Sequence, residues 1–197
     1  MDDIQIKRVV NLADLHKVYQ LTHDSFVAAG LCDNQPRRMI IHHPDQDVLP
    51  ETKIFLAEIN NEPVGSVSFT VDNEFGLMVD SEFKTQIDRY RKFYGKVACF
   101  WRLTIHPAYQ DSIKVLRVML GTIATCLLKN QIPVCFFTFS PEHARIYEKL
   151  VNTEEVCRGR DSNELIKPEH AEVVLMKLYP DKVPDKWFSI VDDDSLN

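Results

Sequence analysis

Two apolar stretches indicate the fold: VACFWRLTI, residues 97–105, and PVCFFTF, residues 133–139. The first is apolar apart from Arg102 and Thr104 and is followed by a His-Pro pair, which predicts a strand that ends there. The second is almost continuously apolar, as expected of a strand buried on both faces. Residues 112–130 between them carry apolar side chains at helical spacing. A strand, helix and strand in this order predict a parallel pair joined by a crossover.

The segments around this unit complete one α/β domain without internal repeats. We expect residues 1–180 to form the domain and residues 181–197 to form a polar, acidic tail. The segment 32–50 is predicted to be a loop or a short helix. The expected elements are strands at 4–10, 53–59, 64–71, 97–105, 133–139, from 156 and at 171–178, with helices at 11–30, 81–94, 112–130 and 141–150.

Composition excludes several classes of protein. An apolar fraction of 45% and a charged fraction of 26% are typical of a globular domain, and no stretch approaches the roughly 20 apolar residues of a membrane span. A net charge of −6 disfavours nucleic acid as a partner. Five cysteines without paired spacing, and an N-terminus without a signal-peptide core, predict a cytoplasmic protein with reduced thiols. The His42-His43 pair lacks a third ligand at metal-binding spacing, so we expect no metal.

Three segments resemble a known family of acyltransferases. FWRLTIHPAYQ, residues 100–110, resembles the end of the central strand in GNAT-type N-acyltransferases. FSPEHARIYEKL, residues 139–150, is similar to the strand and helix that close their thioester site. GSVSF at 65–69 and FGLMVD at 75–80, followed by a charged helix, resemble the N-acyl amino acid synthases related to long-chain N-acyl tyrosine synthases. The resemblance implies a mixed, mostly antiparallel sheet with one splayed parallel strand pair and helices on both faces.

The resemblance also implies where a thioester donor would bind. Tyr147 matches the family's tyrosine on the closing helix and would protonate the departing thiolate, although the same spacing suits a core tyrosine. The main chain of the central strand would hold the thioester arm, and the start of the next helix would hold its phosphate. The donor-binding residues are therefore expected to be Leu103, Thr104, Ile105, Gln110, Ser112, Ile113 and Lys114.

Two further side chains are candidates for the catalytic site. Arg102 is a lone charge in an apolar strand and needs an anionic partner, either a substrate carboxylate or phosphate or an internal acid. We favour a substrate carboxylate or phosphate as the partner of Arg102. His106, at the end of the strand, would be a general base or polar contact, or else an ordinary loop residue.

The donor is expected to be acyl carrier protein rather than coenzyme A. A pyrophosphate loop needs glycines for close backbone approach, whereas residues 110–115, QDSIKV, contain none. The helix at 81–94 carries a cationic cluster that suits an acidic carrier protein, although a solvated helix face gives the same pattern. The cluster is Lys84, Arg89, Arg91 and Lys92.

The leading hypothesis is an N-acyltransferase that moves an acyl chain from a carrier thioester to the amine of an amino acid or similar small molecule. One alternative is a GNAT enzyme that uses acyl-CoA on a protein or metabolite amine. Another is a catalytically silent domain that binds acyl groups or a partner. The phenylalanines of the two decisive strands, with Trp101, would line an acyl-chain tunnel or simply fill the core.

Overall fold

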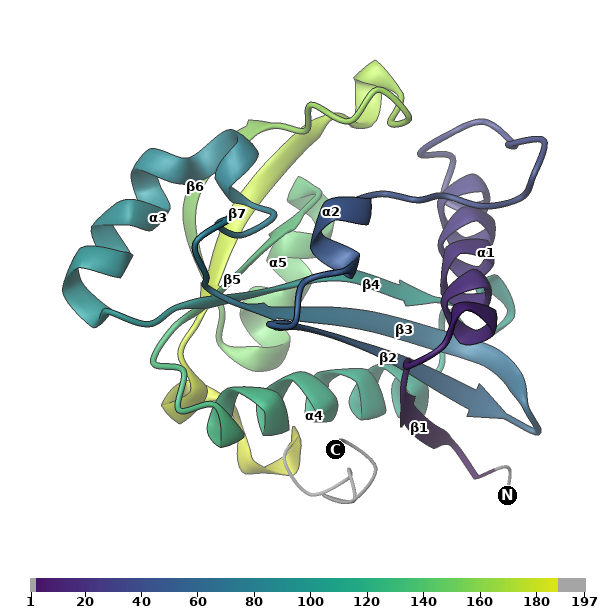
Figure 1. Cartoon of the computed structure of the whole chain (residues 1–197), viewed down its shortest axis with the longest axis horizontal. Helices are drawn as coiled ribbons and strands as arrows, with labels where there is room; N and C mark the ends of the chain where they lie inside the picture. The colour runs from purple at the N-terminus through teal and green to yellow at the C-terminus, as the bar shows by residue number, and fades with distance from the viewer. Residues whose placement is uncertain (1–2, 188–197) are drawn as a thin grey trace.

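A computed structural model describes residues 3–187 and contains one seven-stranded mixed sheet (Figure 1). The strand order across the sheet is β1-β2-β3-β4-β5-β7-β6. The strands are β1 (Gln5–Arg8), β2 (Thr52–Ile59), β3 (Glu62–Val71), β4 (Ala98–Ile105), β5 (Cys135–Phe139), β6 (Glu154–Arg160) and β7 (Glu172–Leu178). The α-helices are α1 (Leu12–Ala28), α2 (Pro44–Asp47), α3 (Asp80–Tyr94), α4 (Ile113–Lys129) and α5 (Pro141–Val151).

The predicted fold class is confirmed. Every strand pair is antiparallel except β4 and β5, which are joined by α4 as a crossover. The parallel pairing covers only Ala98 with Cys135 and Cys99 with Phe136. Beyond these pairs β5 continues beside β7, while β4 continues beside β3. The central pair therefore opens into a V at the end where both strands terminate.

Local sequence signals set most of the boundaries. Asn11 caps α1 by accepting the amide N–H of Asp14 at 2.9 Å, and Ser112 and Ser140 cap α4 and α5 in the same way. Helix α3 begins at Asp80, one residue before the expected start at residue 81. The Asp80 carboxylate accepts the Leu77 amide, so it organises the turn that precedes the helix.

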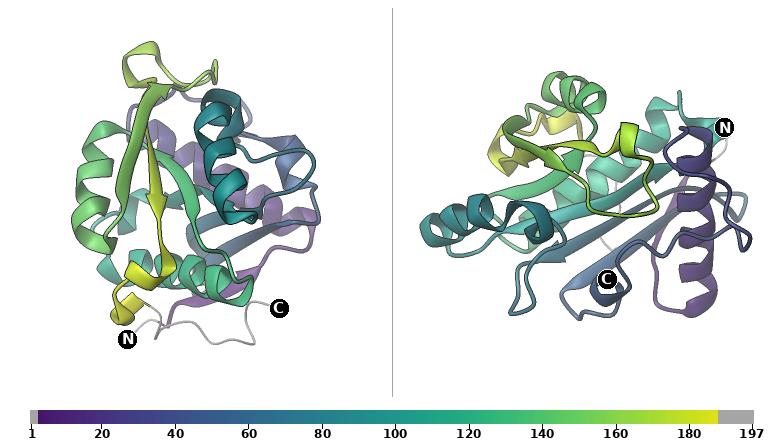
Figure 2. Two further views of the ribbon diagram at one scale, coloured as in Figure 1. Left: turned by 90° about the vertical axis from the view of Figure 1, so that its left-hand side faces the viewer. Right: turned by 90° about the horizontal axis from the view of Figure 1, so that it is seen from above.

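Helices cover both faces of the sheet (Figure 2). Strand alternation divides the core, because Phe55 and Phe100 face α4 and α5, whereas Leu56 faces α1. Trp101 lies in the cluster beneath α3. Gly65 allows α4 to approach β3 closely, since a Cβ at this position would lie 2.9 Å from the sulfur of Met119.

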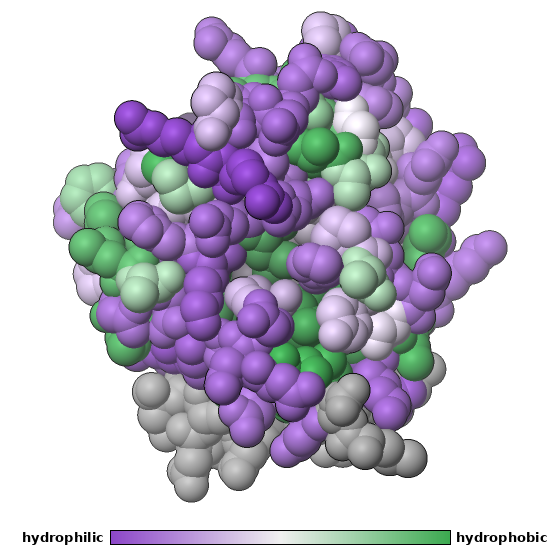
Figure 3. Space-filling view, turned by 90° about the vertical axis from the view of Figure 1, so that its right-hand side faces the viewer, coloured by the Kyte–Doolittle hydropathy of each residue, from purple (hydrophilic) through white to green (hydrophobic). Residues whose placement is uncertain are grey.

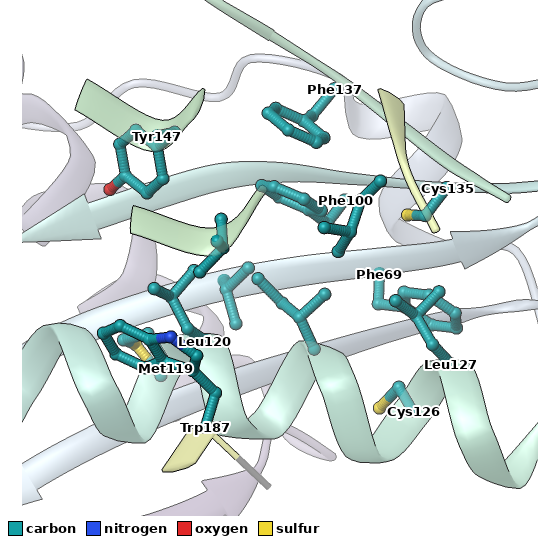
Figure 4. Close-up of a cluster of buried hydrophobic side chains, with 14 of the residues drawn as sticks. Phe69, Phe100, Met119, Leu120, Cys126, Leu127, Cys135, Phe137, Tyr147 and Trp187 are labelled. Atoms are coloured by element: carbon teal, nitrogen blue, oxygen red, sulfur yellow. The ribbon is translucent and has the colours of Figure 1, made fainter. Parts of the chain in front are cut away.

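The aromatic side chains of β4 and β5 pack into the core clusters on the two faces of the sheet. Phe100 and Phe137 stack with ring centroids 4.1 Å apart (Figure 4). The void beside them measures about 10 Å³, about one water-sized probe. An acyl chain therefore has no room between these rings.

The folded domain extends past the expected boundary at residue 180. Val183 and Trp187 are 7% and 1% exposed and belong to the core on α4. The Trp187 indole N–H donates to the carbonyl of Leu150 at 3.3 Å, and its ring lies beside Met119 and Leu120 (Figure 4). Val183 and Trp187 of the expected tail therefore belong to the folded domain, whereas Asp192, Asp193 and Asp194 lie outside the described residues. No helix among residues 3–187 is long and apolar enough to span a membrane.

Candidate active site at the splayed strand pair

Tyr147 closes the open end of the β4–β5 pair. Its ring stacks on Phe139 of β5 at a centroid distance of 4.2 Å, and the residue is 8% exposed. Figure 4 shows its hydroxyl turned away from Phe100 and Phe137, toward the end where β4 terminates. Burial raises the pKa of Tyr147 to about 12. The phenol therefore keeps its proton at neutral pH, as an acid for a departing thiolate requires.

The start of α4 is available to an anion. Gln110, Ile113 and Lys114 are exposed, and Ser112 is partly buried. The Ser112 hydroxyl accepts the Val115 amide N–H at 3.4 Å. The first-turn N–H groups of a helix attract negative charge, and Lys114 adds a full positive charge. Figure 3 shows this end of the molecule as a mainly hydrophilic face with hydrophobic residues exposed near its centre.

A β-bulge shapes β4 beside the opening. In the register with β3, Ser68 faces Trp101 and Ser66 faces Thr104, so β4 has one extra residue between them. Arg102 within the bulge has a φ of 53°, which is rare for a residue other than glycine. After the bulge, Leu103 and Ile105 pack toward the α4 side, and the Thr104 hydroxyl bonds Ser66 at 2.6 Å.

The Arg102 side chain pairs with an internal acid and not with a position open to substrate, contrary to the partner that we favoured. Its guanidinium bonds both carboxylate oxygens of Asp47 at 2.9 Å, and the two side chains are 0% and 1% exposed. Trp101 stacks on the guanidinium at 4.3 Å, and the Tyr19 hydroxyl donates to Asp47 at 2.8 Å. The pair fastens the bulge of β4 to α2. Sequence reasoning missed Asp47 because it lies in a short helix 55 positions away.

His106 lies where β4 ends and has a local structural contact. Its Nδ1 accepts the Ala108 amide at 3.2 Å and thereby caps a 3₁₀ turn over Pro107–Tyr109. This turn leads the chain from β4 to the start of α4. No other hydrogen bond to the His106 side chain is present among the described residues.

A hollow of about 610 Å³ lies on the other face of the sheet, which α3 covers. We call it the acidic hollow. Thr138 reaches it from β5, immediately before Phe139, whose ring stacks on Tyr147. Its volume is typical of a small-molecule site. It is lined by Ile41, His42, His43, Asp45, Gln46, Phe75, Leu77, Met78, Asp80, Ser81, Glu82, Thr138, Asp161, Ser162, Asn163 and Val173.

The titratable groups of the acidic hollow are shifted by burial. Burial raises the pKa of Asp161, and the charge of Glu82 adds to this effect. Burial also lowers the pKa of His43. None of these residues was a candidate from sequence alone, although the adjacent histidines at 42 and 43 were a visible signal. Among residues 3–187, no group of three or more His, Cys, Asp or Glu side chains is arranged to hold a metal.

Acid is expected to destabilise the protein through His42. Burial, with smaller contributions from His43 and Arg102, lowers its pKa to about 3. Below the ordinary value near 6.5, the unfolded chain binds a proton that the folded chain does not, so stability falls as the pH falls from 6.5 toward 3. Between pH 6.5 and 4.5, the free energy of unfolding of the His42→Phe variant should fall by about 2 kcal/mol less than that of the unmodified protein. Urea unfolding at both pH values measures this, and equal losses in both proteins would contradict it.

Two of the four cations in the α3 cluster are neutralised by carboxylates, and the cluster lies far from the start of α4. Arg91 is surrounded by Asp72, Asp80 and Asp88, with contacts of 2.6–2.8 Å. Lys84 pairs with Asp88 at 2.7 Å. Figures 1 and 2 show α3 at the opposite end of the molecule from the end of β4, where α4 starts. Arg89 and Lys92 remain exposed.

Comparisons of the sequence and of the fold find similar proteins. Residues 17–179 match the model of the family N-acyl amino acid synthase FeeM. The structure is similar to that of FeeM, an N-acyl amino acid synthase from uncultured soil microbes, with a TM-score of 0.75 at 15% identity over 97% of this chain and 96% of that one. It also resembles the ribosomal-protein-S18-alanine N-acetyltransferase of Escherichia coli, with a TM-score of 0.60 at 12% identity over 90% and 94%.

A third similar structure is a CoA-dependent acyl-homoserine lactone synthase, BjaI. Its TM-score is 0.64 at 12% identity, over 95% of this chain and 87% of that one. No curated protein matches the sequence.

Proposed function

The chain belongs to the FeeM family of N-acyl amino acid synthases and is an N-acyltransferase, and we propose that it moves an acyl chain from acyl carrier protein to the amine of an amino acid or similar small molecule. The observation that carries the proposal is the opening of β4 from β5 beyond Cys99 and Phe136, with Tyr147 at its open end. This opening admits a narrow thioester arm between two strands, and a small-molecule hollow lies on the far face.

The reaction needs three contributions from the chain. The phosphate of the donor's arm binds at the start of α4, where Ser112, Ile113 and Lys114 lie. The main chain of Leu103, Thr104 and Ile105 positions the thioester and stabilises the oxyanion. The neutral amine attacks the thioester carbon, the carbon–sulfur bond breaks, and Tyr147 gives its proton to the thiolate. Tyr147 then recovers a proton released from the amine nitrogen, so the products are one amide and one thiol.

Arg102 and His106 position other groups in the proposed reaction. Arg102 is a positioning residue, because its pair with Asp47 holds the bulge that precedes the three main-chain contacts. His106 fixes the turn from β4 to α4 and so sets where the phosphate site begins. Neither side chain is needed as the acid or the base.

A carrier protein suits the start of α4 better than coenzyme A does. The glycine-free segment 110–115 offers one helix terminus and one lysine, which match a single phosphodiester rather than a pyrophosphate and an adenosine. Arg145, two residues before Tyr147 on α5, adds an exposed cation for an acidic carrier protein. A reducing cytoplasm would keep the five unpaired cysteines as thiols.

The donor site is tested by charge reversal at two lysines. With acyl carrier protein carrying one chain length, Lys114→Glu should raise the KM for the donor at least about fivefold, because it replaces an attraction for the phosphate by a repulsion. The matched change Lys92→Glu on α3 should leave KM unchanged. The reverse result would place the carrier protein on α3. A higher kcat/KM with acyl-CoA of the same chain would instead favour the CoA-dependent alternative.

A further inference from the structure

The charged side chains that line the acidic hollow are predominantly negative. Four carboxylates line it, and among its described lining residues there is no lysine or arginine. Asp80 is neutralised by Arg91 at 2.6 Å, whereas Asp45, Glu82 and Asp161 form no ion pair within residues 3–187. Burial lowers the pKa of His43, which lies beside them in the lining, and so disfavours its charged form. The hollow therefore attracts cations and repels anions.

Two buried atoms in the same lining lack hydrogen-bond partners. Gln46 is 5% exposed, and its amide oxygen has no partner. The Nε2 of His42 is also buried without one. Both residues belong to the segment around α2 that lines the hollow. An unpaired buried polar atom costs free energy unless a ligand satisfies it, and an ammonium group carries three donors.

Resting on the proposed function, we propose that the preferred acceptor is a cationic amine without a carboxylate next to its reacting nitrogen, such as a decarboxylated amino acid or a diamine. An α-amino acid would place its carboxylate among Asp45, Glu82 and Asp161 with no cation to receive it. The apolar part of the lining, with Leu77, Met78 and Val173, would contact the carbon body of the acceptor.

The carboxylates also supply a base for the reaction. The amine enters as an ammonium and gives one proton to the Asp161 carboxylate, which burial makes a stronger base than an ordinary aspartate. The neutral nitrogen then attacks the thioester, and its second proton leaves by way of Tyr147 to the thiol. The Asp161 proton returns to water when the products leave.

Matched acceptor pairs test the inference. Tyramine with tyrosine, and cadaverine with lysine, differ only by the carboxylate. With one acyl-carrier donor, the decarboxylated member of each pair should have a kcat/KM for amide formation at least about tenfold higher. A preference for the amino acid in both pairs would overturn the inference and leave the proposed function intact.

A charge-neutral variant and a binding measurement complete the test. Glu82→Gln should raise the KM for tyramine about threefold or more and leave that for tyrosine unchanged or lower. The matched Glu62→Gln, at the exposed tip of the β2–β3 hairpin, should change neither. If no acceptor yields an amide, the proposed function fails. Calorimetric titration of tyramine and tyrosine into the full chain then decides the inference, and equal or tighter binding of tyrosine would contradict it.

Discussion

Replacing Asp47 by alanine is expected to lower the free energy of unfolding by about 3–5 kcal/mol, a larger loss than any other substitution proposed for this protein should cause. The change would leave the Arg102 guanidinium buried and unpaired at 0% exposure and would remove the acceptor of the Tyr19 hydroxyl. A buried charge without a partner costs several kcal/mol because the protein interior replaces its hydration poorly. Urea denaturation followed by circular dichroism measures the loss.

A matched surface pair provides the control. Asp33 pairs with Lys167 at 3.0 Å but is 86% exposed, so Asp33→Ala should change stability by less than about 0.5 kcal/mol. Asp47→Asn keeps the shape of the side chain and part of its hydrogen bonding. Its loss in free energy of unfolding should therefore lie between those of Asp33→Ala and Asp47→Ala. A change of under about 1 kcal/mol for Asp47→Ala would show that the pair does not hold β4 to α2.

The largest effect on activity is expected at Tyr147. Tyr147→Phe should lower kcat by about 10²–10⁴-fold, since it removes the proton donor for the departing thiolate. The fold should remain, because the ring keeps its stacking on Phe139, and within residues 3–187 the hydroxyl makes no hydrogen bond. Because the pKa lies near 12, the unmodified enzyme should lose no activity through this group between pH 8 and 10.

Tyr90→Phe on α3 is the matched control, since its hydroxyl contacts Lys177 away from the open end of β4 and β5. It should retain the full kcat. An unchanged kcat in Tyr147→Phe would remove this residue from the mechanism. A lowered kcat together with a lowered melting temperature would assign it to the core.

Periodicity and turn chemistry were enough to predict most of the architecture. The apolar run at 133–139 and the helical spacing at 112–130 predicted a parallel pair with a crossover, and β4, α4 and β5 confirm it. These signals come from residues close together in the sequence, and the spacing of the apolar side chains leaves little freedom in assigning helix or strand. The end of the domain was set too early, because the apolar residues at 183 and 187 are too few to show periodicity and become core only when they meet α4.

The site was less predictable than the fold. Tyr147 and the start of α4 were found through sequence resemblance, because they lie in contiguous motifs. The partner of Arg102 was not found, because Asp47 reaches it across the sheet from a four-residue helix. The acidic hollow was also missed. Its lining comes from segments as distant as His43, Glu82 and Asp161, and only the folded chain brings them together.

An acyl-transfer assay that follows both products tests whether the chain is an N-acyltransferase. The full chain is incubated with acyl carrier protein loaded with one acyl chain and with a mixture of amino acids and amines. Amide is quantified by mass spectrometry and free carrier thiol by a thiol reagent. We expect amide and thiol to appear in equal amounts, and both to be strongly reduced in Tyr147→Phe. Thiol release without amide, or no turnover with either a carrier or a CoA donor, would contradict the assignment as an N-acyltransferase acting at the splayed strand pair.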